Sequence, residues 1–422
     1  MVKQGYKQTE IGVIPEDWEV VDFLDEFVFL STASYSRAEI LEQGTIGYIH
    51  YGDIHTKLHF HLDLDKYVSG YLKKEQVKTY SKIEIGDLIM ADASEDYEGV
   101  GKAVEVIRKN SDFNVISGLH TFLIRAKNIN RFALGFKGYF QNNVLIKKQY
   151  DALATGLKVY SLSKNSFKNI QIPLPPLPEQ EAIATALSDA DAWIESLEQL
   201  IAKKRLIKQG AMQELLTPKD NWEVKKLGDV CIEGGLIRGP FGGALKKEFF
   251  VKSGYKVYEQ KNAIYKSVKL GNYYIDHNKF KELSRFEIKK DDFILSCSGT
   301  IGKIYRIPLI FEKGVINQAL LIIRLNKEVV SHSYFNHVFQ FDTIQSKIID
   351  DTQGGAMKNL VGMSEFRNTE IPLPTLSEQT RIATILSDMD AEIEALEQKL
   401  SKARQIKQGM MQELLTGRVR LV

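Results

Sequence analysis

The sequence has little of what marks secreted, fibrous or membrane-spanning proteins. Its 422 residues include only two cysteines, Cys231 and Cys297, which excludes a disulfide framework and favours a reducing, cytoplasmic setting. No run of about 18 apolar residues occurs, so no membrane-spanning helix is expected, and the first residues lack the apolar core of a secretory signal. With 44% hydrophobic and 26% charged residues, the chain is typical of a globular protein of about two to four domains.

Net charge is also small, at +2, and it is unevenly distributed. Residues 1–171 carry 21 basic and 22 acidic side chains, a balance of −1, whereas residues 218–370 carry 24 basic and 18 acidic side chains, a balance of +6. An excess of positive charge favours an anionic partner such as nucleic acid. Charge therefore supports an anionic partner for the second of these segments and leaves the question open for the first.

The most informative feature that the sequence does contain is a long internal repeat. Ile172–Thr217 and Ile371–Thr416 align without a gap at an offset of 199 residues, and 32 of the 46 positions are identical. A repeat with so long a period indicates two similar halves rather than a solenoid of short units. Two such halves are expected to pack with approximate two-fold symmetry.

Each repeat has the pattern of one long helix. Apolar residues recur at alternating intervals of three and four, which places them on a narrow stripe that is buried against another helix. We expect two helices of about 38 residues that pair antiparallel with each other as a coiled-coil spacer. The residues expected to pair the helices are Leu187, Ile194, Leu197, Ile201, Leu386, Ile393, Leu396 and Leu400.

The segments before the helices match each other more faintly. Residues 48–54 correspond to residues 258–264, and residues 86–90 correspond to residues 291–295. Their short runs of β-branched and aromatic residues predict mixed α/β domains that are rich in short strands. We therefore predict an α+β fold in four segments. These are a first domain at 1–171, a first helix at 172–217, a second domain at 218–370, and a second helix with a C-terminal tail at 371–422.

With these residues in hand, the chain resembles the specificity subunits of type I restriction–modification systems over its whole length. The resemblance is carried by the repeated motifs IPLP-x-L-x-EQ-x-x-I-A and KQG-x-MQELLT, and by the domain strings YGDI, DASEDYEGVGKA, GPFGGALK and SGTIGK. It implies two target recognition domains, each of which reads one half of a bipartite, asymmetric DNA site in the major groove. It also implies that the paired helices set the gap between the half-sites.

The same resemblance implies which partners supply the chemistry. The helices would dock two methyltransferase subunits that methylate adenine, and a motor-endonuclease subunit would join them for restriction. No cofactor is expected in this chain, whereas S-adenosylmethionine, ATP and Mg are expected on the partner subunits. The chain itself is expected to be non-catalytic, because it has no G-x-x-x-x-G-K-[ST] phosphate loop and no Asn/Asp-Pro-Pro-aromatic string for methyl transfer.

Three stretches of the second domain carry side chains suited to DNA. The glycine-rich segment 234–247 lets backbone approach a ligand closely, or it is a flexible surface loop. Residues 296–303 offer hydroxyls and a lysine, or they form a plain turn, and the amides at 317 and 318 either read adenine or satisfy buried backbone. The DNA contacts expected here are Arg238, Phe241, Lys246, Ser298, Thr300, Lys303 and Gln318.

The first domain has its expected DNA contacts at corresponding places. Where the second domain has SCSGT, this domain has the acidic string DASEDYE. Carboxylates repel phosphates, although they can accept a hydrogen bond from the amino group of cytosine. The two half-sites are therefore predicted to differ in sequence. The expected contacts are Ser94, Lys102, His120, Lys158 and Tyr160.

Other classes of function and site stay open. A protein adaptor is compatible with the composition, whereas a nuclease with a coiled-coil arm has only Glu287 and Lys289 as a weak pattern. Histidines at 50, 55, 59 and 61 predict either a zinc site or a polar surface that faces DNA or solvent. No cysteine lies near them in the sequence, so no metal is expected.

Overall fold

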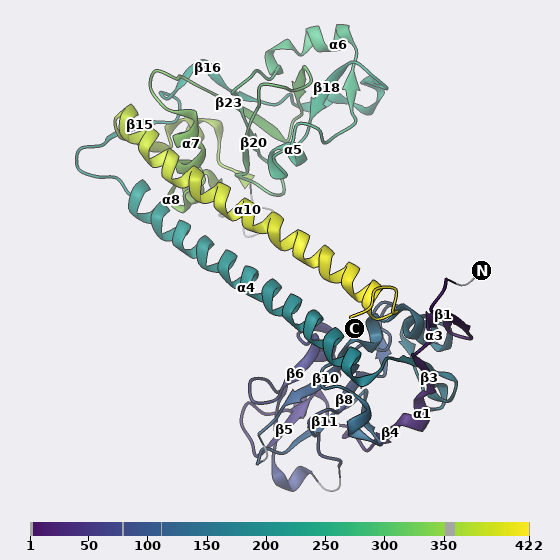
Figure 1. Ribbon diagram of the computed structural model, residues 1–422. Helices are drawn as coiled ribbons and strands as arrows, with labels where there is room; N and C mark the ends of the chain where they lie inside the picture. Colours follow the sequence, from purple (N-terminus) through teal and green to yellow (C-terminus); the bar gives the residue numbers. More distant parts are fainter. Residues whose placement is uncertain (1–2, 78–79, 111, 351–358, 422) are drawn as a thin grey trace. The chain divides into compact units, whose positions relative to one another are not determined.

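The structure is a computed structural model that describes residues 3–77, 80–110, 112–350 and 359–421 (Figure 1). The chain forms two compact units, and each unit takes one stretch from each of two long helices. Unit 1 comprises residues 1–198 and 398–422, and unit 2 comprises residues 199–397. No helix within the described residues has the length and apolar composition that a membrane span requires.

The two repeats form the two longest helices. Helix α4 spans Leu177–Leu216 and helix α10 spans Leu376–Leu414, so they contain 40 and 39 residues. These lengths confirm the prediction of two long helices, which followed from the spacing of the apolar residues. Each helix follows a short strand, β14 (Gln171–Leu174) or β26 (Glu370–Leu373).

A glutamine anchors the start of each long helix in the same way. Gln180 Nε2 donates to the carbonyl of Pro175 at 2.9 Å, and Gln379 Nε2 donates to the carbonyl of Pro374 at 2.9 Å. Each glutamine also accepts a backbone N–H of its own domain through Oε1. The spacing between the prolines and the glutamine, which the two repeats share, therefore fixes each helix to the domain that precedes it.

A five-stranded sheet forms the centre of unit 1, in the order β4-β12-β8-β10-β6. Its strands pair antiparallel except β6, which lies parallel to β10 at one edge. All four residues of β8 are buried, as expected for a central strand that is covered on both faces. The strands are β4 (Phe27–Leu30), β12 (Thr121–Ala126), β8 (Leu88–Ala91), β10 (Ala103–Arg108) and β6 (Phe60–Asp63).

Smaller elements complete unit 1. A three-stranded sheet has the order β11-β5-β7, from β11 (Val115–Ser117), β5 (Ile46–Ile49) and β7 (Gly70–Leu72). The two-stranded pairs are β1 (Tyr6–Thr9) with β2 (Gly12–Pro15), β3 (Glu19–Asp22) with β14, and β9 (Ala93–Ser94) with β13 (Tyr160–Ser161). The α-helices are α1 (Phe23–Glu26), α2 (Tyr51–Thr56) and α3 (Val144–Leu153).

Unit 2 is built around two four-stranded sheets, in the orders β16-β23-β20-β21 and β17-β19-β18-β22. The first contains β16 (Cys231–Arg238), β23 (Leu320–Leu325), β20 (Phe293–Ser296) and β21 (Ile304–Arg306). The second contains β17 (Phe250–Val251), β19 (Tyr274–Ile275), β18 (Tyr255–Tyr258) and β22 (Gly314–Ile316). Two further pairs are β15 (Glu223–Lys226) with β26, and β24 (Ile349–Asp350) with β25 (Asn359–Leu360). The helices are α5 (Gln260–Ile264), α6 (His277–Glu282), α7 (His332–Val338), α8 (Asp342–Ile348) and α9 (Met363–Asn368).

The faint sequence match between the two domains is a structural match. Strand β5 leads into α2 as strand β18 leads into α5, and each strand pairs parallel with a later strand, β11 or β22. The second matched stretch forms β8 in unit 1 and β20 in unit 2, which are central strands. Mixed α/β domains rich in short strands were predicted, and this prediction is confirmed.

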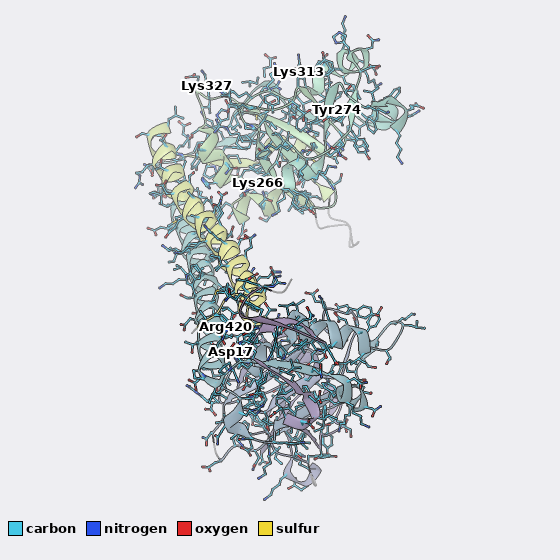
Figure 2. All side chains as sticks on the ribbon, turned by 45° about the vertical axis from the view of Figure 1, so that its right-hand side comes forward. Asp17, Lys266, Tyr274, Lys313, Lys327 and Arg420 are labelled. Atoms are coloured by element: carbon cyan, nitrogen blue, oxygen red, sulfur yellow. The ribbon has the colours of Figure 1, made fainter. Side chains whose placement is uncertain are left out.

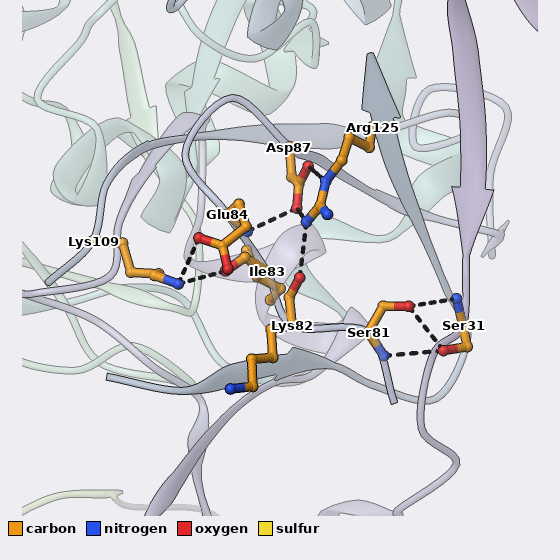
Figure 3. A network of polar contacts seen from close by, with 8 residues as sticks. All are labelled: Ser31, Ser81, Lys82, Ile83, Glu84, Asp87, Lys109 and Arg125. Carbon is orange, nitrogen blue, oxygen red and sulfur yellow. Dashed lines mark hydrogen bonds and ion pairs between the residues drawn. The ribbon is translucent and has the colours of Figure 1, made fainter. Parts of the chain in front are cut away.

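Each domain also holds its central sheet with the same ion pair, whose aspartate is buried. In unit 1, Arg125 donates to both carboxylate oxygens of Asp87 at 2.7 Å and to the carbonyl of Lys82 (Figure 3). In unit 2, Arg324 binds Asp292 through the same two nitrogens, also at 2.7 Å. A forked, two-bond contact of this kind fixes orientation as well as distance.

The cores of the units include the ends of both long helices. The main core of unit 1 contains Trp18 from the start of the chain, Leu187 from α4 and Leu414 from α10. Leu386 occupies the same position in the core of unit 2. The apolar stripe is therefore not buried against a helix alone, because its ends also pack on the domains. Among the predicted pairing residues, the buried ones are Leu187, Leu197, Ile201, Leu386 and Ile393, and the partly buried ones are Ile194, Leu396 and Leu400.

Within each unit the two helices run antiparallel, and ion pairs join them. In unit 1, Arg404 of α10 binds Glu198 of α4 at 2.6 Å, and Lys407 binds Asp191. Unit 2 repeats both contacts at the offset of 199 residues, with the roles of α4 and α10 exchanged. The unit 2 pairs are Arg205–Glu397 and Lys208–Asp390. Each unit therefore holds the same two ion pairs, with the helix that supplies the cation exchanged.

The last residues of the chain pack onto the first ones in unit 1 (Figure 2). Arg420 binds both carboxylate oxygens of Asp17, at 2.9 and 2.6 Å, and both of Glu179, at 2.7 and 2.9 Å. Tyr6 donates its hydroxyl to the carbonyl of Gly417 at 2.9 Å. A Cβ at Gly417 would meet Pro15 at 2.5 Å, so only glycine fits this contact. The C-terminal tail is thus a structural part of unit 1.

Candidate functional site

Three loops of unit 2 meet at one end of the β16-β23-β20-β21 sheet. Arg238 ends β16, the turn 297–303 follows β20, and the turn 317–319 precedes β23. The backbone joins them: Gly239 N donates to the carbonyl of Leu320 at 2.9 Å, and Cys297 N donates to the carbonyl of Ala319 at 2.8 Å. A Cβ at Gly239 would lie 1.9 Å from the carbonyl oxygen of Asn317, so this close approach requires glycine.

These loops carry most of the residues that the sequence predicted for DNA contact in unit 2. Ser298, Thr300 and Gln318 are exposed in their turns. The side chain of Lys303 is also exposed, while its backbone N–H donates to Ser296 Oγ at 3.1 Å. The structure therefore brings these side chains and Arg238 to one end of the sheet. Their role in binding stays a prediction.

The remaining two predicted residues lie further along the glycine-rich segment. Phe241 is 74% exposed. Lys246 is exposed and approaches Glu248 at 3.8 Å, so part of its charge is locally balanced. Asn317, which had two alternative roles, accepts the backbone N–H of Ala319 at 3.0 Å through Oδ1 and thus braces the turn.

Sequence reasoning missed Gln260, the first residue of α5. Its Nε2 would lie 3.7 Å from a Cβ at Gly299, beside the turn that carries Ser298 and Thr300. Its Oε1 is buried and makes no hydrogen bond to any described residue. A lone glutamine in a short helix gives no motif, and only the correspondence between 258–264 and 48–54 pointed to this part of the chain.

Unit 1 has a cavity of about 810 Å³ at the corresponding end of its sheet. It is lined by residues of α2, the acidic loop after β8, the turn before β12, and the end of the segment 137–142. Asp92 N donates to the carbonyl of His120 at 3.1 Å, which joins the acidic loop to the turn. His120 has a φ of 54°, a backbone conformation that a non-glycine residue rarely adopts and that is found at functional sites.

All five residues predicted for DNA contact in unit 1 lie at or next to this cavity. Ser94, Lys102 and His120 line it. Tyr160 pairs with Ser94 between strands β13 and β9, and its ring lies 4.0 Å from that of Tyr97. Lys158 is exposed, directly before the lining residue Val159. Tyr51 and Asn142 also line the cavity, and sequence reasoning did not select them because neither belongs to a charged or glycine-rich motif.

Burial changes the acid–base behaviour of two groups here. Burial lowers the pKa of Lys102, whose ammonium donates to the carbonyl of His55 at 2.7 Å. Burial also raises the pKa of Asp92, while His120 at 3.3 Å acts in the opposite direction. The lysine is thus engaged with backbone rather than presented as a free charge.

Three of the four clustered histidines bond to backbone atoms through their rings. His50 Nδ1 accepts from the N–H of Gly52 at 3.1 Å, His55 Nε2 lies 2.9 Å from the carbonyl of Ala93, and His61 Nε2 lies 2.8 Å from that of Gly135. In the part of the chain that the structure describes, no group of three or more His, Cys, Asp or Glu side chains could hold a metal ion. Burial also raises the pKa of Cys231 and of Cys297 to about 12, so neither thiol is an activated nucleophile.

Several known proteins are similar to this chain in sequence over nearly its whole length. A putative type I restriction enzyme MjaX specificity subunit of Methanocaldococcus jannaschii is 27% identical, and the alignment covers 99% of this chain and 97% of that protein. The type I restriction enzyme MjaVIII specificity subunit of the same organism is 24% identical over 99% and 97%. The type I restriction enzyme EcoKI specificity subunit of Escherichia coli K12 is 20% identical over 96% and 89%.

Solved structures share the fold. A chain from a study of complex assembly and conformational transition of the type I R-M system gives a TM-score of 0.61, at 16% identity and with 96% and 99% of the two chains covered. The type I restriction-modification S subunit from M. genitalium gives 0.53, at 15% identity and with 94% and 96% covered. These likenesses concern the fold alone.

The family comparison covers most of the chain. The type I restriction modification DNA specificity domain matches twice, at residues 15–204 and 219–405. Each match contains one domain, its cluster of loops, and the greater part of the long helix that follows. The chain therefore belongs to the type I restriction–modification DNA specificity family and carries two copies of its domain.

Proposed function

We propose that the chain is the non-catalytic specificity subunit of a type I restriction–modification complex and that each unit reads one half of a bipartite DNA site. One observation carries the proposal. In both units, polar loops gather at the same end of the central sheet, although the loops differ in sequence. A common scaffold with unlike loops is suited to reading two different base sequences, because specificity comes from side chains that reach base edges.

We further propose that α4 and α10 set the gap between the half-sites and dock two methyltransferase subunits, which a motor-endonuclease subunit joins. Exposed apolar side chains on the helices support this. Ile207 of α4 and Ile406 of α10 are both exposed and stand at equivalent positions of the repeat, and Leu206 and Trp193 are exposed as well. Exposed apolar residues at repeated positions favour two copies of one partner over two unrelated partners.

A protein adaptor is the second candidate function, favoured only by the near-neutral charge of the first domain. Salt separates the two candidates. Binding through several phosphates loses affinity steeply as salt is added, whereas binding of a protein partner does not need to follow that dependence.

The test is sequencing of bound DNA. The full chain, with and without methyltransferase subunits, is incubated with random duplexes, and the retained pool is sequenced. We expect two fixed blocks separated by a degenerate gap of constant length. A pool without enrichment would overturn the proposal.

Arg238→Ala assigns one block to unit 2. We expect a loss of about 1–3 kcal/mol for that block alone if Arg238 contacts a guanine. Lys327→Ala is the matched control, because Lys327 follows β23 at the opposite end of the sheet and is exposed. An equal loss of affinity for all sequences would make Arg238 a phosphate contact instead.

A further inference from the structure

Unit 1 carries an apolar tip, residues 156–160, at the rim of its cavity. Leu157 is 96% exposed, more than any other large hydrophobic residue that the structure describes, and Val159 is 52% exposed and lines the cavity. We infer that Leu157 is a wedge that enters the stacked bases of DNA and opens one base step. The inference deepens the proposed function and rests on it, because it adds a deformation of the duplex to the reading of one half-site.

The base of the tip is held firmly. Thr155 and Ser161 exchange two backbone hydrogen bonds, of 3.0 and 2.9 Å. The chain that leaves the tip pairs with strand β9, and the ring of Tyr160 lies 4.0 Å from the ring of Tyr97 in the acidic loop. A tip that is already ordered loses little conformational freedom on binding, so its side chains are positioned at low entropic cost.

Gly156 sets the shape of the turn. Its φ is 136°, a conformation that residues with a side chain rarely adopt, and a Cβ would lie 1.8 Å from the carbonyl oxygen of Val159. The chain therefore turns sharply directly before Leu157. Because the Leu157 side chain is almost fully exposed, it adds almost nothing to the core of unit 1. This leucine is buried only when a partner covers it.

Position and charge favour DNA as that partner. The tip borders the cavity that carries the predicted DNA contacts of unit 1. Lys158 is exposed beside Leu157 and makes no ion pair with any residue that the structure describes, so it can bind a phosphate next to the opened step. Proteins that kink DNA insert apolar side chains such as leucine between base steps. A leucine and a lysine on one ordered turn fit that role.

The second half of the chain argues against a protein partner at this tip. Ala356 stands at the position equivalent to Leu157 in the sequence, 199 residues later. A methyltransferase subunit that docks on both halves alike would require a large apolar residue at both positions. Ile207 and Ile406 on the long helices meet that requirement, whereas Leu157 does not. The tip is therefore suited to something that differs between the two halves, such as the DNA sequence.

A wedge also predicts a feature of the DNA sequence. The pyrimidine–purine steps TA and CA/TG are the flexible steps of DNA and are the most easily unstacked. We expect one of these steps at a fixed position in the half-site of unit 1 when the bound pool is sequenced. Its selection would come from the low cost of opening it.

The experiment measures stacking at single bases. 2-Aminopurine, which fluoresces more strongly when it is unstacked, replaces one purine at a time in the half-site that Arg238→Ala leaves unaffected. Fluorescence is measured at saturating full chain, alone and with methyltransferase subunits, for the wild type, Leu157→Ala, Leu157→Phe and Ile129→Ala. Ile129 is the matched control, because it is 60% exposed and follows β12 at the opposite end of the sheet.

We expect fluorescence to rise at one step with the wild type, with Ile129→Ala and with Leu157→Phe, which keeps a large apolar wedge. Leu157→Ala should leave that step stacked and bind the site about tenfold more weakly, since a leucine side chain is no longer buried. Any base that a methyltransferase subunit unstacks by itself brightens equally with Leu157→Ala, so only the rise that depends on Leu157 counts. Thermal unfolding should be unchanged in both Leu157 variants, because the side chain is exposed.

The inference is overturned if no step brightens, or if Leu157→Ala brightens the same step as the wild type. It is also overturned if replacing a thymine by uracil weakens wild-type binding as much as Leu157→Ala does, without unstacking, because Leu157 would then cover a thymine methyl group. Weaker assembly of Leu157→Ala with methyltransferase subunits at unchanged DNA affinity would make the tip a protein contact instead. An enriched pool without unstacking that depends on Leu157 contradicts this inference and leaves the proposed function standing, whereas a pool without enrichment contradicts both.

Discussion

The two units treat the same pair of residues differently. In unit 1, Trp18 Nε1 donates to Glu179 at 2.8 Å, and Glu179 is 1% exposed and bound by Arg420. In unit 2 the equivalent Trp222 Nε1 is buried without a partner among the described residues, and Glu378 lies 3.5 Å from Lys219 and 4.0 Å from Arg381. The C-terminal tail explains the difference, because it supplies the cation that allows a glutamate to be buried in unit 1.

Other features are held constant. Both units contain the forked arginine–aspartate pair at the central sheet. In both, equivalent ion pairs also join the long helices. The comparison teaches that near-identical repeats guarantee neither the same burial nor the same partners. It also identifies which contacts should have equal energies in the two units and which should not.

The largest effect is expected where the units agree. Arg125→Ala and Arg324→Ala each leave a carboxylate uncompensated, on Asp87 or Asp292, which are 1% and 2% exposed. We expect each variant to lower the free energy of unfolding of its own unit by about 3 kcal/mol. Denaturant unfolding, with hydrogen exchange followed peptide by peptide, measures the loss and assigns it. Arg306→Ala, which breaks an exposed pair with Asp291, is the control and should cost under about 1 kcal/mol. A loss in one unit only would break the equivalence.

The next effect should be confined to unit 1. Arg420→Ala removes the cation from Glu179, which keeps its bond to Trp18, so we expect a loss of about 2–3 kcal/mol in unit 1 and none in unit 2. Faster hydrogen exchange around residues 12–22 is the readout. Arg418→Ala breaks an ion pair with Glu413 in which the two charged groups are 3.7 Å apart and largely exposed, so this variant should change little. Unchanged exchange in Arg420→Ala would mean that the tail does not stabilise the unit.

A third difference concerns acid. In unit 1 the helix is met by Tyr139, which donates to Asp191 at 3.0 Å, and in unit 2 by His337, which lies 3.0 Å from Ser387 Oγ and 3.8 Å from Asp390. Burial lowers the pKa of His337 from 6.5 to about 4. Because the folded-state pKa is depressed, the neutral histidine stabilises unit 2 fully above about pH 6.5, and this stability is lost as pH falls towards 4.

We therefore expect protonation of His337 to cost unit 2 about 2 kcal/mol between pH 7 and pH 5. Stability against pH, measured for the wild type and for His337→Gln, provides the check. The glutamine variant has no group that titrates at position 337, so the stability of its unit 2 should depend much less on pH in this range. An identical pH profile for the two proteins would exclude His337 as the cause.

The smallest effect should be equal again. Arg404→Ala and Arg205→Ala break exposed pairs between the helices, with Glu198 and Glu397 respectively. Each should cost about 0.5 kcal/mol and less at high salt. Thermal unfolding at low and high ionic strength tests this expectation. A larger loss for either variant would indicate that its pair belongs to a cooperative network.

Sequence alone predicted the helices because their signal is local and periodic. A stripe repeated over ten turns and written twice leaves little choice of structure, and the observed lengths agree with it. The equivalence of the domains was also predictable, because residues 48–54 and 258–264 occupy the same strand-to-helix step in both units. Loops have no periodic pattern of apolar residues, so the sequence does not predict their conformation in the same way.

The contacts that sequence could not predict join residues far apart in the chain. Arg420 lies 241 positions from Glu179 and 403 from Asp17, and no local pattern relates such positions. Lys407 interrupts the apolar stripe, yet it is 5% exposed, because its ammonium lies 3.6 Å from the ring centre of Phe60 and binds Asp191. Asn142 and Gln260 were missed for a similar reason, since an unpaired amide is visible only once its surroundings are known.

The division of the chain has a consequence for its synthesis. Unit 2 is one continuous stretch, whereas unit 1 needs residues 398–422, which leave the ribosome after all of unit 2. Until then Leu414 and Leu415 are missing from the unit 1 core, so nascent chains expose apolar surface through the translation of about 200 further residues. A premature stop near residue 398 would spare the later-made unit and leave the first-made one unfinished, the reverse of the usual polarity of truncation.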